Sequence, residues 1–441
     1  MILFLKARQR LPRKSLMILA KAIKAKSMEQ QSNEVYEVVV VGAGISGLAT
    51  AVALTRLGIS NIIVLEKSDS LRSTGTAITL FPNAWCVLDA LGVAPKLTYL
   101  YDPYDKWHIK NIEDGSRRTF TTTETSPRRK MEARVVHRKA LLEALASELP
   151  HGIIRFSSKL ISIKSEAIKD LERLNYLLLE DGTTIKTKAV IGCDGVHSRV
   201  AQWLGLPKPI SSGRSAIRAL AVFPDGHGFP NEYRTYLDNK GIKVGFVPLN
   251  KTELYWFVVH KTSTSDSQDP DQILQEVIEN LQARNFPDDI LTVVKHSDSS
   301  SLIRTPLLLR TPWDILFCRA HRWNVTVAGD ALHPMTPDMA QGGCTSLEDA
   351  VVLARNVFSG TQISDSGFAR YLRERQWRTA CLTGSAYLAG WTPQDNRPIL
   401  NRFMAWFIKK IFNRFVFPKM RRYAICYECG DLPTIMEKKS T

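Results

Sequence analysis

The sequence AGDALHPMTPDMAQGGC, at residues 328–344, decides the fold. The β-branched residues before it predict a strand from Asn324 to Val327, which delivers Asp330 at its carboxyl end. A loop with two prolines follows, and then the glycine pair Gly342 and Gly343 precedes a predicted helix start. This order places a carboxylate, which accepts hydrogen bonds, close to the free N–H groups of a helical first turn.

A second glycine element lies near the start of the chain. Val35 to Val41 has the composition of a buried parallel strand, and a G-x-G-x-x-G motif separates it from a predicted helix, Leu48 to Leu57. A second strand, Asn61 to Leu65, ends at an acid 24 residues after the first glycine. This order is typical of a dinucleotide-binding unit, in which the acid binds ribose hydroxyls. The residues predicted to bind the ligand here are Gly42, Gly44, Ile45, Ser46, Gly47, Glu66 and Lys67.

The two elements together indicate which dinucleotide binds. A glycine-rich loop alone predicts only some dinucleotide. In the downstream element, Asp330 can accept hydrogen bonds from ribityl hydroxyls, and the N–H groups after Gly342 can face an electron-rich flavin ring. The pair therefore predicts FAD, bound non-covalently.

Two shorter elements support this interpretation. Asp194 and Gly195 follow a predicted strand from Ala189 to Gly192, although such a pair can also form an ordinary turn. Arg138 opens a predicted helix with an apolar face, where it can meet a phosphate or a flavin edge. The alternative for Arg138 is an ordinary surface arginine.

These four elements together resemble the single-component FAD-dependent aromatic hydroxylases, the family of para-hydroxybenzoate and salicylate hydroxylases. The closest resemblance is to plant monooxygenases related to zeaxanthin epoxidase, and it covers roughly residues 35–390. The chain departs from the family pattern at Ala340, where glycine is usual; at positive φ an alanine costs about 1 kcal/mol. The positions that match the pattern are Gly42, Gly44, Gly47, Glu66, Arg138, Leu141, Asp194, Gly195, Ser198, Val200, Gly329, Asp330, Ala331, His333, Pro337, Gln341 and Gly342.

The resemblance implies an α/β (α+β) fold: a Rossmann-like FAD-binding domain, an inserted mixed β-sheet substrate domain and C-terminal helices. The FAD-binding domain is expected to be discontinuous. The expected segments are a basic N-terminal extension at 1–33, FAD-binding segments at 34–100, 130–205 and 315–395, substrate-domain segments at 101–129 and 206–314, and a basic helical tail at 396–441.

The resemblance also implies the chemistry. NAD(P)H, as a transient reductant, reduces FAD, and a flavin C4a-hydroperoxide formed with O2 hydroxylates a small, aromatic substrate. Because the flavin is the reactive group, no catalytic side chain is assigned, and His333 is interpreted as loop structure. The alternatives are an epoxidase acting on an isoprenoid or carotenoid-like substrate, a flavin-dependent reductase, and a non-catalytic flavin-fold relic. Downstream, the predicted cofactor-binding residues are Arg138, Asp194, Gly195, Asp330, Pro337, Gln341, Gly342 and Gly343.

The net charge of +16 lies at the two ends of the chain. Residues 1–27 hold eight Lys or Arg and no acid, and residues 397–441 hold ten Lys or Arg and three acids. Residues 28–396 therefore carry only +1, which argues against a nucleic-acid partner. The basic start has the composition of a transit peptide, or it is an extension upstream of a start at Met28. We expect an intracellular protein, either cytoplasmic or organellar (mitochondrion or chloroplast).

The remaining features concern partners. Seven scattered cysteines favour reduced thiols, and the lone C-x-x-C at Cys426–Cys429 has no second pair, so no metal is predicted. Between Pro398 and Phe417, apolar residues recur at helical spacing with basic residues largely elsewhere. This helix either docks on the body or contacts a membrane surface. The expected partners are otherwise a small-molecule substrate and O2, and the chain is expected to be a monomer or weak dimer.

Overall fold

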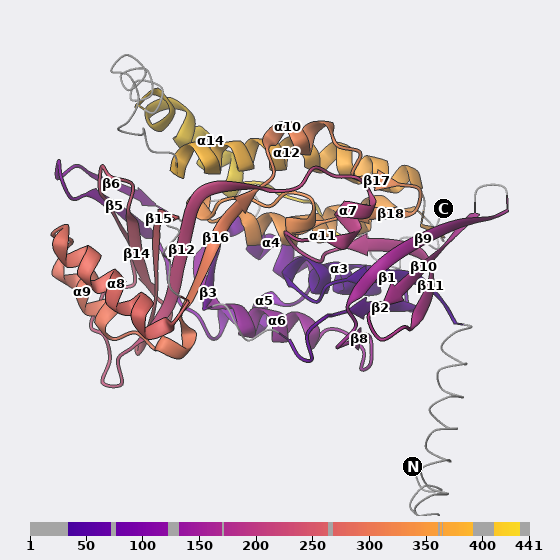
Figure 1. Cartoon of the computed structure of the whole chain (residues 1–441), viewed down its shortest axis with the longest axis horizontal. Helices are drawn as coiled ribbons and strands as arrows, with labels where there is room; N and C mark the ends of the chain where they lie inside the picture. The colour runs from indigo at the N-terminus through magenta and orange to yellow at the C-terminus, as the bar shows by residue number, and fades with distance from the viewer. Residues whose placement is uncertain are drawn as a thin grey trace, which may run out of the picture.

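The chain forms two lobes that share a long interface (Figure 1). The computed structural model describes residues 34–71, 76–121, 132–169, 172–262, 268–359, 362–363, 365–390 and 410–432. The predicted N-terminal extension, residues 1–33, lies outside these ranges, as does most of the predicted helix from Pro398 to Phe417. Within the described residues, no helix is long and apolar enough to cross a bilayer.

The larger lobe is built on an eight-stranded sheet with a parallel centre. Its strand order is β17-β18-β11-β1-β2-β8; β10 pairs antiparallel with β11, and β9 pairs antiparallel with β10. The predicted strand Val35–Val41 is confirmed as β1, and its last four residues are buried because helices cover both faces. The strands are β1 Val35–Val41, β2 Ile62–Leu65, β8 Ile154–Arg155, β9 Leu160–Lys169, β10 Glu172–Leu179, β11 Thr184–Gly192, β17 His321–Arg322 and β18 Val325–Val327.

Helices pack on this sheet and connect its strands. The first begins at Ile45, three residues earlier than predicted, so the second half of the glycine motif is already helical. Arg134 to His137 belong to a strand, β7, and Arg138 is the first residue of the helix that follows, as predicted. The helices of this lobe are α3 Ile45–Arg56, α4 Pro82–Ala90, α5 Ala94–Thr98, α6 Arg138–Ala146, α7 Arg199–Trp203, α10 Pro312–Phe317, α11 Gly342–Val357 and α12 Asp365–Gly390.

The smaller lobe, at the left of Figure 1, is the mixed sheet that the sequence predicts. Its strand order is β16-β12-β15-β14-β13-β5-β6, and only the β13–β5 pair is parallel. The predicted hairpin of β5 and β6 forms its edge. The elements are β5 Lys106–Asn111, β6 Arg117–Thr121, β12 Ile210–Val222, β13 Tyr233–Leu237, β14 Lys243–Pro248, β15 Glu253–Lys261, β16 Ile303–Leu309, α8 Pro270–Ala283 and α9 Asp288–Lys295.

The side chains of strand β15 show that a separate hydrophobic core packs on each face of this sheet. Its side chains alternate between the faces of the sheet, as pleated backbone requires. Trp256 and Val258 pack in a core with α8 and α9, whereas Tyr255 and Phe257 join the core of the larger lobe. The smaller lobe therefore presents one face, rich in aromatic residues, to the larger lobe.

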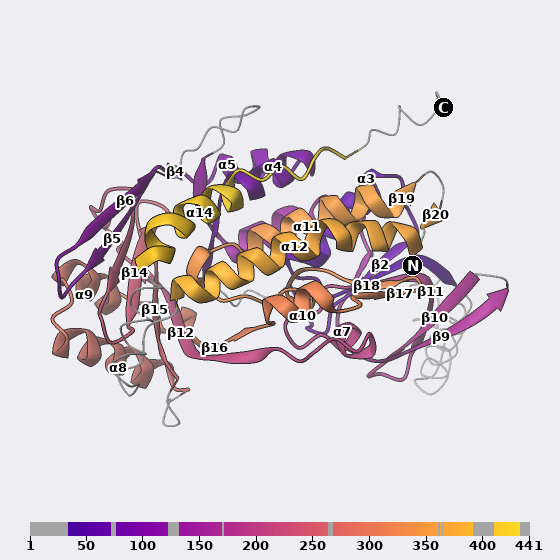
Figure 2. The same cartoon turned by 90° about the horizontal axis from the view of Figure 1, so that it is seen from above.

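Three short strands and a C-terminal segment complete the fold. Strands β3 Ala77–Leu80, β7 Ala133–His137 and β4 Pro103–Tyr104 form a small sheet in the order β3-β7-β4. Strands β19 Phe358–Ser359 and β20 Gln362–Ile363 form a hairpin before α12. The C-terminal segment consists of η4 Phe412–Val416, a π-helix, and α14 Phe417–Ile425, and it crosses from α12 toward the β5–β6 hairpin (Figure 2).

Trp256 tests the second core. Its side chain is completely buried, and its indole N–H donates to the Ser297 hydroxyl at 2.8 Å. Trp256→Ala should lower the free energy of unfolding by about 3–5 kcal/mol, because it leaves a large cavity. Urea unfolding measures this change. Trp256→Phe, which keeps most of the volume, is the control, and an equal loss in both variants would show that packing is not the cause.

Candidate functional site

The carboxyl ends of four parallel strands meet at one edge of the main sheet. The Gly42 N–H donates to the Leu65 carbonyl at 2.7 Å, and the Cys193 N–H donates to the Val41 carbonyl at 2.7 Å. The Ala328 N–H donates to Gly192 at 2.9 Å. The turns after β2, β1, β11 and β18 therefore lie side by side, which is where open α/β sheets bind ligands.

Two of the three motif glycines are required by close backbone contacts. Gly42 has φ +103°, and a Cβ there would lie 2.5 Å from the Cys193 carbonyl oxygen. A Cβ on Gly47 would lie 1.8 Å from the Gly42 oxygen. A Cβ on Gly44, in contrast, would meet no atom within 4 Å, so its backbone borders open space. This is the arrangement in which a phosphate can approach the first turn of a helix.

Glu66 lies directly under the glycine loop. Its buried carboxylate accepts hydrogen bonds from the Ala43 N–H at 2.8 Å and from the Ser68 N–H at 3.0 Å. These bonds fix the acid beside the backbone that approaches the dinucleotide. Lys67, which follows it, has an exposed side chain.

Asp330 follows β18 and faces the open side of the same edge. Its side chain is exposed and makes no hydrogen bond with any described residue. Although this side chain reaches solvent, the protein packed around it raises the pKa of Asp330 by partial desolvation, while the charges of His333, Arg138 and Arg218 act to lower that pKa. Ser46 is close by, since a Cβ on Gly329 would lie 2.8 Å from the Ser46 Cβ.

The loop after Asp330 leads into helix α11. Residues Pro337–Met339 form a short 3-10 turn, η3, and Ala340 ends it with φ +50° and ψ +34°. The position that the family pattern gives to glycine is therefore left-handed in this chain. Gln341 is buried and its Oε1 accepts from the Asn83 amide at 3.0 Å. A Cβ on Gly343 would collide with Ile78 at 2.2 Å and would also approach Ile45.

Asp194 has a structural task as well as a place at the site. Its Oδ2 accepts from the Arg199 N–H at 2.6 Å and from the Val200 N–H at 3.3 Å, which caps α7. Its Oδ1 is buried without a hydrogen-bond partner among the described residues. Gly195 has φ +80°, as a residue in a tight turn can. Asp194 and Gly195 can therefore form a turn and also bind a ligand.

The residues at this edge fit FAD. The space beside Gly44 suits a pyrophosphate, and the Asp330 carboxylate can accept hydrogen bonds from ribityl hydroxyls. The buried Nε2 of Gln341 is a donor without a partner among the described residues, which matches an acceptor on the flavin ring. The structure thus brings the predicted residues of the glycine loop together with Asp330 and the residues of the downstream loop.

A buried carboxylate that the sequence analysis did not assign holds this edge together. Asp349, on α11, accepts from the Gly329 N–H at 2.8 Å and from His333 Nε2 at 2.7 Å. Its other oxygen accepts from Arg375 Nε, on α12, at 2.6 Å. Burial alone would raise the pKa of Asp349, but His333 and Arg375 outweigh it and lower the pKa to about 2. The sequence did contain a signal for this carboxylate, because Glu348 and Asp349 are two adjacent acids within an otherwise apolar stretch of α11.

The neighbouring Glu348 extends this network to the C-terminal segment. It pairs with Arg375 at 2.7 Å and with Arg378 at 2.6 Å, and it accepts from the Asn83 amide at 2.7 Å. Burial raises the pKa of Glu348, but the two arginines hold it below the usual range. Arg378 also donates to the carbonyls of Tyr423 and Ala424, at the end of α14.

A buried ion pair joins the flavin loop to the smaller lobe. Asp338, in η3, accepts from both terminal nitrogens of Arg214 on β12, at 3.2 and 2.7 Å. Lys243 on β14 lies 3.6 Å from the same carboxylate. A bidentate pair of this kind fixes orientation as well as distance. The ion pair therefore holds the two lobes in a defined relative position at the loop that precedes α11.

The smaller lobe turns an arginine and several aromatic rings toward this site. Arg218, on β12, pairs with Phe257 across β15 and therefore points to the face that meets the larger lobe. It makes no hydrogen bond or ion pair with the described residues. Burial raises the pKa of both Tyr233 and Tyr255, and Arg218 opposes the rise in each. The ring centroids of Tyr233 and Phe257 are 6.2 Å apart.

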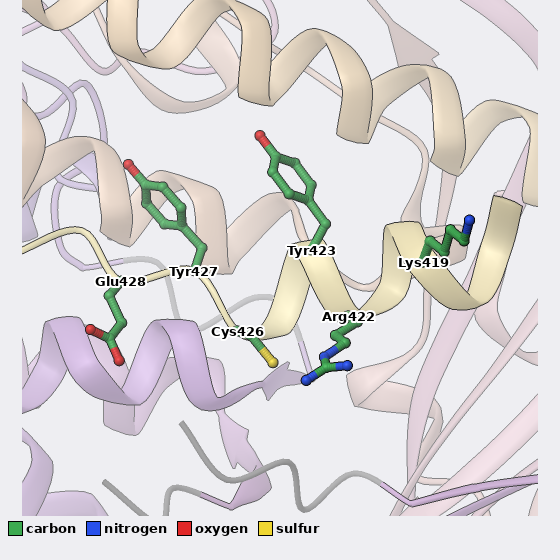
Figure 3. Close-up of a pocket in the computed structure, with 6 residues that line it drawn as sticks. All are labelled: Lys419, Arg422, Tyr423, Cys426, Tyr427 and Glu428. Atoms are coloured by element: carbon green, nitrogen blue, oxygen red, sulfur yellow. The ribbon is translucent and has the colours of Figure 1, made fainter. Parts of the chain in front are cut away.

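A separate surface pocket of about 450 Å³ lies on the C-terminal segment. Tyr423 and Tyr427 point to one side of the segment, and Arg422, Cys426 and Glu428 point to the other (Figure 3). Arg378 lies 3.8 Å from the centroid of the Tyr427 ring. The pocket contains none of the predicted site residues. Its full lining is Lys419, Arg422, Tyr423, Cys426, Tyr427 and Glu428.

Comparison with known proteins gives one family. A family model described as an FAD binding domain matches residues 35–383. Monooxygenase 2 of Arabidopsis thaliana is 38% identical over 423 residues, which cover 92% of this chain and 100% of the relative. Monooxygenase 1 of the same plant is 34% identical over 412 residues, which cover 90% of this chain and 99% of that relative. A chloroplastic zeaxanthin epoxidase of Prunus armeniaca is 26% identical, with 80% of this chain and 54% of the epoxidase covered.

Solved structures confirm the predicted fold class. HpxO of Klebsiella pneumoniae, complexed with FAD and uric acid, superposes with a TM-score of 0.75 at 22% identity. The match covers 90% of this chain and 98% of HpxO. The oxygenase of 2-methyl-3-hydroxypyridine-5-carboxylic acid gives a TM-score of 0.66 at 19% identity, with 90% and 98% covered. At these identities the likeness shows the fold alone.

Ala340 offers a test of backbone strain in the flavin loop. Ala340→Gly should stabilise the protein by up to about 1 kcal/mol and slow flavin release several-fold, because glycine tolerates the left-handed conformation. Thermal melting and the rate of flavin release measure the change. Asn285, with φ +54°, is the matched control, since asparagine already tolerates this region and Asn285→Gly should gain less. A less stable Ala340→Gly protein would mean that the methyl contact outweighs the strain.

Asp349 tests the buried network. Asp349→Asn should lower the free energy of unfolding by about 3 kcal/mol at neutral pH, because it leaves Arg375 partly uncompensated, and should weaken flavin retention. The pKa of Asp349 is lower in the folded state than in the unfolded chain. Its contribution is therefore present above about pH 4 and is lost as the pH falls toward 2.

Urea unfolding at a series of pH values measures both effects. The acid-induced loss of stability between about pH 4 and 2 should be smaller in Asp349→Asn than in the parent chain. Asp365→Asn is the control, because the side chain of Asp365 is 63% exposed at the start of α12. Identical pH profiles for Asp349→Asn and the parent would contradict the assignment.

Proposed function

Because the chain belongs to the family of FAD-binding monooxygenases, we propose that it hydroxylates a small aromatic anion. Electrons come from NAD(P)H, as a transient reductant, and one oxygen atom comes from O2. When bound, FAD supplies the redox chemistry by accepting electrons from NAD(P)H and passing one oxygen atom of O2 to the substrate. The residues of the chain bind and orient the reactants.

The single observation that carries this proposal is Arg218. Arg218 is half-buried on the face between the lobes and makes no hydrogen bond with the described residues, so its guanidinium can pair with an anionic ligand that displaces water. A carboxylate or phenolate supplies that partner, and guanidinium binds carboxylate through two parallel hydrogen bonds. The neighbouring rings of Tyr233, Tyr255 and Phe257 suit a flat aromatic body.

The remaining residues have separate roles toward the cofactor. The first turn of α3 beside Gly44 faces the pyrophosphate, and Glu66 lies where an adenosine ribose would bind. Asp330 binds the ribityl chain. The first turn of α11, beginning at Gly342, directs its N–H groups and its positive dipole end at the ring, where negative charge develops on reduction. The aromatic face of the smaller lobe excludes water.

An epoxidase acting on an isoprenoid is the second candidate. Its support is the match to the zeaxanthin epoxidases, which covers 80% of this chain. A hydrocarbon chain, however, offers no acceptor to the guanidinium of Arg218. The arginine therefore favours an anionic substrate.

The purified flavoprotein decides between these functions. Phenolic acids, flavonoids and isoprenoids are added one at a time, and NAD(P)H oxidation is followed together with transfer of labelled O2 into the product. An aromatic acid should stimulate NAD(P)H oxidation and gain one labelled oxygen atom. Oxidation that every compound leaves unchanged, or an isoprenoid that alone becomes labelled, would contradict the proposal.

Arg218 provides the matching prediction. Arg218→Gln should raise the KM for an anionic substrate by about 10- to 100-fold, because it removes a charged hydrogen bond. The KM of Arg218→Lys should lie between those of the parent chain and of Arg218→Gln. Flavin content should not change. Arg173→Gln is the control, since Arg173 stacks on Trp323 at 3.6 Å. An equal effect on anionic and neutral analogues would show that Arg218 does not pair with the substrate charge.

A further inference from the structure

Exposed apolar side chains are concentrated on one helical face of the protein. Sixteen large apolar side chains of the described residues are exposed, and nine of them lie on α10, on α12 or within residues 410–425. Figures 1 and 2 show α10, α12 and α14 on the same side of the molecule, away from the α8–α9 pair. The nine residues are Trp313, Phe317, Trp377, Tyr387, Leu388, Ile411, Phe415, Val416 and Tyr423.

Three exposed aromatic side chains, here called the aromatic surface, lie on α10 and α12. Trp313 and Phe317, one turn apart on α10, are stacked with an interplanar angle of 6°, and they are 68% and 78% exposed. α10 packs along α12, because Gln376 donates to the carbonyls of Ile315 and Cys318. Trp377, the next residue of α12, is 64% exposed. Moving exposed indole and phenyl rings from water into an apolar or interfacial environment lowers the free energy.

The exposed charges on these helical segments are mostly basic. Across residues 312–319, 365–390 and 410–432, six basic side chains are exposed and three acidic ones are. Arg373 lies one turn before Trp377 on α12, and Arg414 lies beside Phe415, which is 63% exposed. The basic residues are Arg319, Arg373, Lys410, Arg414, Lys419 and Arg422, and the acidic residues are Asp365, Glu428 and Asp431.

We propose that this helical face docks on the surface of an anionic lipid bilayer. Aromatic and aliphatic side chains would enter the headgroup region, and the lysines and arginines would lie at the level of the lipid phosphates. A second copy of the chain is a poorer occupant, because two copies would bring the same excess of positive charge together. The larger lobe, which contains both this helical face and the flavin edge, would then lie against the membrane.

Vesicle co-sedimentation of the full-length flavoprotein tests the proposal. The protein should sediment with vesicles that contain phosphatidylglycerol and should remain in solution with pure phosphatidylcholine. Raising the salt concentration should weaken binding, because screening reduces the attraction between basic side chains and lipid phosphates. No binding to the anionic vesicles would overturn the proposal.

Two sets of variants locate the contact. Trp313→Ser with Phe317→Ser should weaken binding by about tenfold, since it removes apolar area that enters the interface. Tyr99→Ser is the matched control: Tyr99 follows α5 and is 89% exposed, and α5 lies apart from α10 and α12 in both views. Equal binding by the double variant and this control would overturn the proposal.

Charge reversal forms the second set. Arg373→Glu with Arg414→Glu should abolish binding to the anionic vesicles, whereas Lys240→Glu with Lys251→Glu, in exposed turns of the smaller lobe, should retain it. Flavin content and NAD(P)H oxidation in solution should be unchanged in every variant. Failure of vesicle binding would therefore leave the hydroxylase proposal intact.

Two further outcomes would also overturn the proposal. Sedimentation velocity without lipid would detect a dimer that the Trp313→Ser and Phe317→Ser substitutions disrupt, which would make a second copy the occupant. A melting temperature several degrees lower in that double variant would show that residues 391–409 of the same chain cover the aromatic surface. The membrane proposal requires a monomeric contact surface and an unchanged melting temperature.

Discussion

The carboxylate of Asp349 receives hydrogen bonds from three segments that are far apart in the chain. The Gly329 N–H comes from the turn after β18, His333 from the flavin loop, and Arg375 from α12. Because Asp349 belongs to α11, this one carboxylate determines how the strand end, the loop and the start of the helix lie relative to one another. Removing the charge leaves the buried Arg375 with only Glu348 to compensate it, which is more destabilising than the loss of a surface pair.

Glu348 connects this buried network to the C-terminal segment and to the loop before α11. Through Arg378 it reaches the carbonyls at the end of α14, and through Asn83 it reaches Gln341 in the flavin loop. The C-terminal segment in turn contacts the β5–β6 hairpin, where Arg421 donates to the Thr121 carbonyl. The helical face and the flavin edge are therefore connected through Glu348 by polar contacts, several of them buried, which hold a geometry more strictly than apolar packing does.

Local sequence patterns were sufficient for the parts of the site that a single segment forms. The β-branched strand, the glycine motif and the acid of the first unit predicted the backbone edge, and the position of Asp330 followed from the strand before it. Arg218 and the pair of Asp338 with Arg214 were not predictable, because each depends on segments more than a hundred residues apart. The start of α3 at Ile45 was also missed, since glycine disfavours helices in isolation and packing against Cys193 overrides that preference.

Four arginines near the site, Arg214, Arg218, Arg375 and Arg378, differ in what compensates their charge. Arg214, Arg375 and Arg378 are each satisfied by a buried carboxylate, so a ligand could gain little by contacting them. Arg218 faces the aromatic side of the smaller lobe without such a partner. A site can tolerate an uncompensated guanidinium only where solvent or a ligand reaches it. The same fold thus uses one residue type to fix its lobes together and to recognise what enters between them, and the difference lies in whether a carboxylate of the chain is within reach.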